Sequence, residues 1–338
     1  GTFLVRSGIL NSIHTFANDP ERGLFILIFL FILIFLSIII FFLFNKKDEN
    51  ENVNFFWLSK ETAILINNWF MMYFLSVVLI GTVYPIFLDV LTTNKISVGP
   101  PFYHKLIIPF LIPFLIMMGI GSRLKWIKSN LEDKAQLILA LIISILIAIL
   151  IVKNLDVKFL INITLISSAF YLFLITSRDF FIKKEKNNPQ KIAHFGFSLL
   201  ILSILVNNLF STEIITNLKV GQQFENSNSK IIFKNIVKKE KKNYRSIVGN
   251  FIIENNDGKI EEFFPELRIY NQPKIVTSEA DIKTTFTTDR FMTINVVQNQ
   301  EYFNIRYQSK PFMIWIWLSV ILISCGGILS FLNKEYEK

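Results

Sequence analysis

Seven long apolar stretches divide the sequence. A helix needs about 20 mostly apolar residues to cross a bilayer core of roughly 30 Å, and these stretches have about that length. They run over residues 24–44, 64–88, 105–121, 137–152, 159–176, 192–210 and 312–332. The pattern predicts a membrane bundle of about six helices over residues 24–210, and a last transmembrane helix with a cytoplasmic tail over residues 312–338.

Between the sixth and seventh stretches the apolar runs become short. Ile231-Ile232-Phe233 and Phe251-Ile252-Ile253 are examples. Short alternating runs of this kind are typical of half-buried β-strands. Asn256-Asp257-Gly258 follows the second run, and Asp-Gly supplies the positive φ angles of a tight hairpin. We therefore expect residues 211–311 to form a β-rich domain, a small antiparallel sandwich or barrel.

The segment before the first apolar stretch, residues 1–23, is amphipathic. On a helix, the apolar positions 5, 9, 13 and 16 share one side, and His14 lies on the opposite, polar side. Asp19-Pro20 then interrupts the pattern, because a proline disfavours helical geometry in the residue before it. His14 is therefore expected just outside a membrane span.

Composition and charge support the same fold. Hydrophobic residues make up 52% of the chain, too many for an ordinary soluble domain. The net charge of +9 could suggest nucleic acid, but in a membrane protein the placement of Lys and Arg sets the orientation. That bias places residues 1–23 and 211–311 outside, and no nucleic-acid partner is expected. The predicted fold is a polytopic α-helical membrane protein of about seven transmembrane helices, with an external antiparallel β domain inserted before the last helix.

The cysteine, the basic run and two of the tryptophans give further expectations about the structure, but they indicate no reaction. The one cysteine, Cys325, lies in the last apolar stretch, so the β domain has no disulfide. The chain has no C-x-x-C-H motif and therefore cannot itself carry covalently attached haem. The basic run Lys238–Lys242 either binds an acidic partner or lipid headgroups, or is a solvated hairpin edge. Trp315 and Trp317 are expected to anchor the last helix at the headgroup level. No soluble-enzyme motif is present, and we assign no catalytic residue.

The three histidines are candidate ligands of haem iron. An axial ligand donates a ring nitrogen to iron, and a polar neighbour orients the other nitrogen. His14 has polar neighbours and membrane beneath it, although an exposed histidine can also be plain surface. His194 lies about one turn inside the sixth stretch with Ser198 one turn further along, so it faces the bundle interior or extends to the headgroups. His104, after Gly99-Pro100-Pro101, is expected on a loop surface.

Several stretches, in order along the chain, resemble the CcmF family, the membrane subunit of the cytochrome c haem lyase. They are residues 1–8 (GTFLVRSG) with 12–20 (SIHTFANDP), 98–101 (VGPP), 193–196 (AHFG), 311–318 (PFMIWIWL) and 326–327 (GG). The resemblance implies that His14 ligates the haem being delivered and that His194 ligates a permanent haem b. The family's Trp-rich segment and its other ligand histidines belong to a region that precedes Gly1, so we expect the chain to be a C-terminal portion.

The resemblance also implies an activity, partners and a location. The family joins haem to the C-x-x-C-H thiols of apocytochrome c, and the thiols must be reduced for that reaction. The implied partners are the upstream Trp-rich portion of the same lyase, a haem chaperone, a thiol-presenting partner, apocytochrome c and membrane lipid. The implied location is the bacterial inner membrane, or the mitochondrial inner membrane. Two alternatives stay open: a permease or channel without haem, and a non-catalytic scaffold subunit of a split lyase.

Overall fold

The computed structural model divides the chain into two compact units, residues 1–172 and 173–338, which are described separately. The described residues are 19–44, 56–92, 98–130, 133–153, 155, 159–181, 188–226, 229–255, 258, 260–272, 275–297 and 301–332. His14 and most of the predicted amphipathic segment lie outside the described residues.

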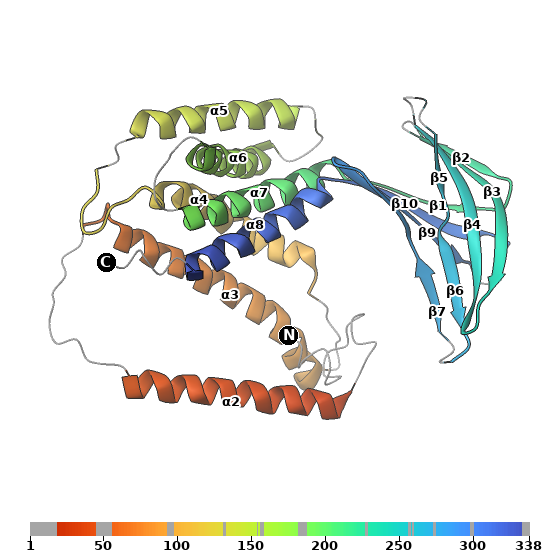
Figure 1. Ribbon diagram of the computed structural model, residues 1–338, viewed down its shortest axis with the longest axis horizontal. Coiled ribbons are helices and arrows are strands. Elements are labelled where there is room, and N and C mark those ends of the chain that lie inside the picture. The colour runs from red at the N-terminus through yellow and green to blue at the C-terminus, as the bar shows by residue number, and fades with distance from the viewer. Residues whose placement is uncertain are drawn as a thin grey trace. The chain divides into compact units, whose positions relative to one another are not determined.

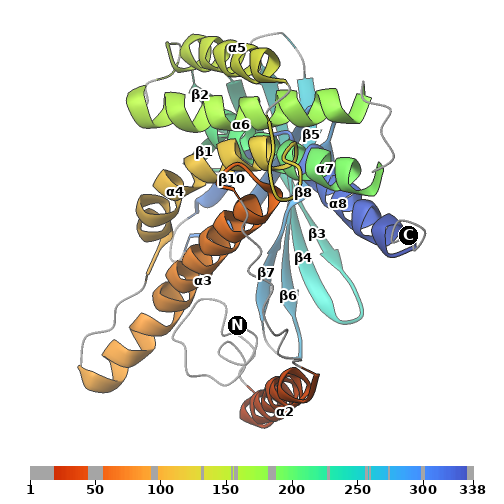
Figure 2. The same ribbon diagram turned by 90° about the vertical axis from the view of Figure 1, so that its left-hand side faces the viewer.

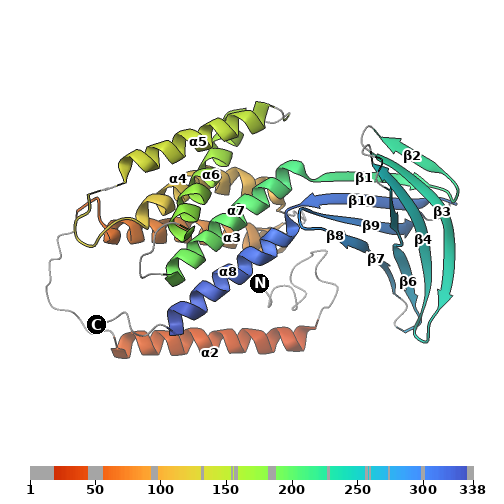
Figure 3. The same cartoon turned by 45° about the horizontal axis from the view of Figure 1, so that its top comes forward.

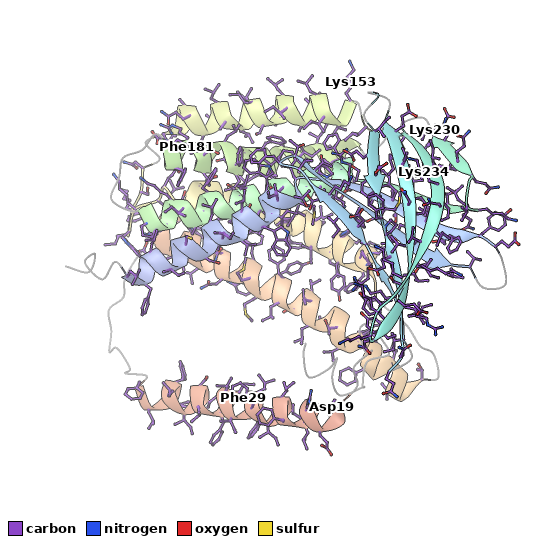
Figure 4. All side chains as sticks on the ribbon, turned by 45° about the vertical axis from the view of Figure 1, so that its right-hand side comes forward. Asp19, Phe29, Lys153, Phe181, Lys230 and Lys234 are labelled. Carbon is purple, nitrogen blue, oxygen red and sulfur yellow. The ribbon has the colours of Figure 1, made fainter. Side chains whose placement is uncertain are left out.

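Seven helices in the described residues are long and apolar enough to cross a membrane, which confirms the predicted number. In Figure 1 they are α2 (Pro20–Phe44), α3 (Lys60–Leu91), α4 (Pro100–Gly121), α5 (Lys134–Lys153), α6 (Phe159–Phe181), α7 (Asn188–Phe210) and α8 (Met313–Leu332). α2 to α5 and most of α6 belong to the first unit, and the end of α6, α7 and α8 belong to the second. The side chains of α2, including Phe29, project from every side of the helix (Figure 4).

Local signals set where the helices begin. The backbone N–H of Arg22 donates to Oδ1 of Asp19 at 3.1 Å, which caps α2 immediately before Pro20. Gly99 caps α4, and Pro100 and Pro101 occupy its first two positions. A proline is tolerated there because the first N–H groups of a helix have no partner within it. His104 is exposed, as expected. The prediction that it lies on a loop is wrong, because the residue belongs to α4.

Aromatic side chains pack α3 against α4 in the first unit. The ring of Phe114 lies edge-on to those of Phe70 and Phe74, with centroids 5.6 Å and 5.7 Å away. The Tyr73 hydroxyl donates to the carbonyl of Leu106 at 3.0 Å, in the turn before Pro109. Because a polar group without a partner is costly inside a membrane, this bond lets the Tyr73 side chain pack against α4.

The β domain of the second unit is a sandwich of two antiparallel sheets. One sheet has the order β1-β10-β9-β8, and the other has β2-β3-β4-β6-β7 with β5 paired to β4. The strands are β1 (Thr212–Leu218), β2 (Gln223–Asn226), β3 (Ser229–Glu240), β4 (Tyr244–Asn255), β5 (Ile260–Phe263), β6 (Glu266–Tyr270), β7 (Val276–Glu279), β8 (Asp281–Thr284), β9 (Thr288–Val296) and β10 (Phe303–Pro311). The predicted β domain before the last helix is confirmed.

Both sheets contribute to one core between them. Phe233 of β3 stacks on Phe251 of β4 with ring centroids 4.2 Å apart, and Ile294 of β9 packs against them from the other sheet. All three side chains are fully buried. Burying an apolar side chain of this size contributes roughly 1.5–3 kcal/mol, so each of these residues contributes to the stability of the sandwich.

Two predicted features of the strands have clear positions. β3 and β4 form the long hairpin visible in Figure 2, and the basic run begins at the exposed end of β3, where Lys241 N donates to Tyr244 O at 2.9 Å. That position fits a solvated hairpin edge. β4 pairs antiparallel with β5, and Gly258 between them has a φ of +70°, as the Asp-Gly signal predicts.

The sandwich connects to a closely packed helix pair. Figure 3 shows α7 leading into β1, and β10 leading into α8 beside it. A Cβ at Gly326 would lie 2.8 Å from the backbone oxygen of Pro189, and one at Gly196 would lie 3.0 Å from the backbone nitrogen of Ile323. Glycine therefore lets the two backbones approach, as small residues do between membrane helices.

Candidate functional site

Two of the three histidines lie in the described residues. His104 is in α4 of the first unit, and His194 is in α7 of the second. Each is the only histidine of the described part of its unit. Within the described residues, no group of three or more His, Cys, Asp or Glu side chains could hold a metal ion. The candidate site is therefore built around one imidazole, that of His194.

The end of α6 packs against α7 one turn after His194. Oγ of Ser198, one turn after His194, lies 2.5 Å from Oγ1 of Thr176, and Ser198 also donates to the carbonyl of Phe195 at 2.8 Å. Both hydroxyls are buried. A hydroxyl pair of this kind satisfies its own polarity inside a membrane, so it joins α6 to α7 without exposing an unpaired group.

Aromatic rings extend this contact towards the end of α6. Phe195 stacks on Phe180 with ring centroids 4.8 Å apart and an interplanar angle of 7°. Phe173 and Phe181 also lie within 6.0 Å of the Phe195 ring. Stacked rings are stabilising beyond the area that they bury. They hold α7, and therefore His194, in a fixed rotation about the helix axis.

His194 itself lies at the border of this packed side. On the helix, it is close to Ser198 on one side and to Phe197 and Ile201 on the other. His194, Phe197 and Ile201 are partly exposed within the described residues, whereas Ser198 is fully buried. The imidazole thus lies between the buried hydroxyl of Ser198 and the partly exposed apolar side chains of Phe197 and Ile201.

Asp179 is the charged residue that acts on His194. It lies near the end of α6, and its carboxylate interacts electrostatically with the imidazole. A carboxylate near a histidine can fix the ring orientation of a metal ligand. Neither Thr176 nor Asp179 could be assigned to the His194 region from the sequence, because their spacing from it depends on how α6 and α7 pair.

The arrangement suits an axial ligand of haem better than a structural metal site. One or two imidazoles beside an apolar surface are enough to hold haem iron, whereas structural zinc sites usually need four side-chain ligands. His194 supplies one imidazole next to the Phe195 ring cluster and to partly exposed apolar residues of α7. These residues therefore fit one side of a haem pocket.

The sandwich contains a separate polar cluster. Nη1 of Arg290 in β9 lies 2.7 Å from Oε1 of Glu261 in β5, so an ion pair joins the two sheets. Nearby, burial raises the pKa of Tyr307, and the positive charge of Arg290 opposes that rise. At the outer edge, hydrogen bonds from Gln308 and Arg306 lower the pKa of Glu213. These groups set the charge and stability of the sandwich rather than a catalytic centre.

Comparison with known proteins supports this description. The family model described as the CcmF C-terminal β-sandwich matches residues 209–311. A cytochrome c-type biogenesis protein CcmF from Pseudomonas fluorescens is 30% identical over 352 residues, covering 99% of this chain and 53% of the relative. Over nearly its whole length, the chain is similar to CcmF proteins.

Other CcmF relatives agree. The CcmF proteins of Pseudomonas aeruginosa and Escherichia coli are 28% and 27% identical, each over 100% of this chain, which covers 53% and 54% of their lengths. The chain thus spans about half the length of the curated CcmF proteins that it matches. A solved structure named cytochrome c haem lyase CcmF has the same fold, with a TM-score of 0.63 and 19% identity over 81% of this chain and 46% of that one.

Proposed function

We propose that the chain takes part in cytochrome c maturation as part of a haem lyase. The observation that carries the proposal is His194 beside partly exposed apolar residues of α7, in a chain similar to CcmF proteins. In this role the chain faces the bacterial periplasm, or the intermembrane space, with residues 1–23 and the sandwich. The family match favours this function over a permease or channel.

His194 would hold a resident haem b through a ring nitrogen, and the carboxylate of Asp179 would act on the same imidazole electrostatically. The Thr176–Ser198 hydroxyl pair, together with Phe180 and Phe195, keeps α7 from rotating. The haem, when bound, supplies one-electron transfer that keeps delivered haem iron ferrous. An upstream portion of the lyase would supply a second histidine for this haem.

His14 holds the substrate haem at the external surface. The reaction adds the S–H of each apocytochrome thiol across a vinyl group of that haem. A C–S bond forms at one vinyl carbon, and the hydrogen goes to the other, so the addition consumes no oxidant. The thiols must arrive reduced, and a haem chaperone and a thiol-presenting partner deliver the two reactants. The histidine of C-x-x-C-H then replaces His14 on the iron.

The sandwich docks the protein that brings the thiols, either the thiol-presenting partner or apocytochrome c. Its position in the chain between α7 and α8 supports this role, because it keeps the sandwich next to two helices long and apolar enough to cross the membrane. Deletion of residues 215–305 should abolish that binding. If the shortened chain still binds the same partner with unchanged affinity, the sandwich is not the docking domain.

The test of the proposed function is cytochrome c maturation in a bacterial host that lacks its own CcmF, with this chain expressed together with an upstream portion. His14→Ala should abolish maturation, and His194→Ala should reduce it, because each removes an imidazole ligand. His104→Ala is the matched control and should mature cytochrome c fully, since His104 is exposed in the other unit.

Immunoblots of the membranes show whether each variant inserts. A His14→Ala variant that is inserted at the normal level and matures cytochrome c fully would contradict the external haem role. Equal maturation by the His194→Ala variant would contradict the role of His194 in the lyase.

A further inference from the structure

The β8–β9 turn, Thr285–Thr288, carries an aromatic residue at its tip. The turn is closed by its own hydrogen bonds: Thr285 N donates to Thr288 O at 3.0 Å, and Thr288 N donates to Oγ1 of Thr285 at 3.1 Å. These bonds hold the turn without help from its tip. Phe286 at the tip is 63% exposed, so the turn presents an aromatic ring that the sandwich core does not bury.

This turn is bound to the first turn of α8. Nε1 of Trp315 donates to the carbonyl of Phe286 at 3.0 Å, and the two rings lie edge to face with centroids 4.8 Å apart. The backbone N–H of Phe312 donates to Thr287 O at 2.8 Å. Phe312 has a φ of +61°, a left-handed conformation that is uncommon for an aromatic residue. The hydrogen bond to Thr287 fixes the chain at this point, where β10 becomes α8.

The contact with α8 places the turn at the membrane boundary. α8 has 20 residues, which span about 30 Å and therefore match the hydrocarbon thickness of a bilayer. Trp315 is therefore at one end of the hydrocarbon region, where indole rings are favoured. Phe286, whose ring contacts that of Trp315, is at the same level.

The outer surface of the sheet beside the turn also carries apolar side chains with a lysine nearby. Ile282 of β8 is exposed and pairs with Phe291 of β9, and Nζ of Lys310 lies 5.3 Å from the Phe291 ring centroid. Lys310 is near the end of β10, three residues before α8 begins. An ammonium group directly above an apolar contact is the arrangement that suits lipid phosphate groups over acyl chains.

We propose that the β8–β9 turn is a membrane foot of the sandwich. Phe286 enters the bilayer boundary next to Trp315, and its partner is the lipid itself, with acyl chains around the ring and phosphate groups near Lys310. The foot adds a non-covalent attachment to the two covalent links to α7 and α8. It therefore limits the tilting of the sandwich relative to the membrane. The proposal depends on the transmembrane position of α8 and is independent of haem binding.

Electron paramagnetic resonance of a spin label tests the foot. The sequence has one cysteine, so Cys325→Ser gives a background in which a single new cysteine can be labelled. Labels are placed by Phe286→Cys, or by Thr287→Cys, which keeps the Phe286 ring. The full chain is reconstituted in nanodiscs of phosphatidylcholine and phosphatidylglycerol, and collisions of each label with oxygen and with a water-soluble nickel chelate are measured.

Two exposed apolar residues provide matched controls. Val296→Cys reports water, because Val296 is 51% exposed and lies at the opposite end of β9 from Thr288. Val320→Cys reports lipid, because Val320 is 43% exposed on α8. The labels at 286 and 287 should have oxygen-to-nickel collision ratios shifted from the Val296 value towards the Val320 value.

Two results would overturn the proposal. Ratios equal to that of Val296 at both turn positions would place the turn in water. Low collision with both oxygen and nickel would mean that protein, rather than lipid, covers the ring. The use of two positions keeps the test valid if Phe286→Cys fails to fold, because Thr287→Cys leaves every contact of Phe286 in place.

Discussion

The ion pair between Arg290 and Glu261 gives the sharpest test of how the sandwich is held together. Arg290 extends inward from β9 and Glu261 from β5, so the pair joins the two sheets, and their side chains are only 13% and 11% exposed. Nε of Arg290 is buried without a hydrogen-bond partner in the described part of the chain. The ion pair is therefore costly to bury, and Arg290 offsets the charge of Glu261.

The magnitude follows from burial and distance. The charged atoms of the pair lie 2.7 Å apart. At an effective dielectric constant of about 20, unit charges at that separation attract by about 6 kcal/mol, and the loss of hydration offsets most of this attraction. Removal of one partner leaves a buried charge and costs roughly 3–5 kcal/mol, while replacement of both by apolar residues is often close to neutral. Arg290→Met should therefore destabilise the sandwich strongly, and Arg290→Met with Glu261→Leu should recover most of the loss.

Hydrogen exchange measured by mass spectrometry on the full chain in detergent is the assay, read on a peptide that covers β9. Arg290→Met should speed exchange of the β9 amides, and the double variant should return it close to the parent rate. Lys234→Met is the control: it breaks the Lys234–Glu262 pair, whose side chains are about half exposed, and should leave exchange unchanged. Lys234 is labelled in Figure 4. If the double variant exchanges as fast as Arg290→Met alone, the reasoning is wrong.

Two further predictions test the helix pair and the edge of the sandwich. Gly326→Ala should weaken the packing of α7 against α8, because the new Cβ would lie 2.8 Å from backbone atoms of α7. Gly327→Ala is the control and should be neutral, because nothing lies within 4 Å of a Cβ at that position. Thermal unfolding in detergent compares the two variants, and equal midpoints would contradict the packing. The pKa of Glu213 is lowered from its ordinary value of 4.5 by hydrogen bonds from Gln308 and Arg306. Its contribution to stability is therefore present above that ordinary value and is lost as pH falls through the lowered pKa. The unfolding midpoint of the parent should fall more steeply than that of Glu213→Gln below about pH 4.5, and parallel curves would refute the assignment.

The number of transmembrane helices and the presence of a β domain could be predicted, because both have strong local signals. Apolar stretches of transmembrane length predicted the seven spans, and the Asp-Gly pair predicted the β4–β5 hairpin, where Gly258 has a positive φ. The start of α4 was mispredicted, because Gly99-Pro100-Pro101 is compatible both with a turn and with a helix N-terminus. Only the continuation of the helix after Gly99 distinguishes the two.

The contacts around the candidate site could not be predicted, because they depend on how distant segments pair. The spacing of four residues predicted that Ser198 lies beside His194 on one helix. Its hydrogen-bond partner Thr176 could not be predicted, because it is on another helix. Trp315 was predicted as a membrane anchor, and nothing in its own segment indicates that its ring N–H binds the carbonyl of Phe286. The ligand role of His194 was suggested by the family resemblance and remains a prediction, as does that of His14.

The most direct test of the account is the absorbance spectrum, with a pyridine haemochrome assay, of the chain purified in detergent together with an upstream portion of the lyase. The parent and the His104→Ala variant should both contain a b-type haem, and His194→Ala should lose it while the complex stays assembled. An assembled His194→Ala complex that keeps its full b-type signal, or a parent complex without haem, would contradict the central claim that α7 carries an axial ligand of a resident haem.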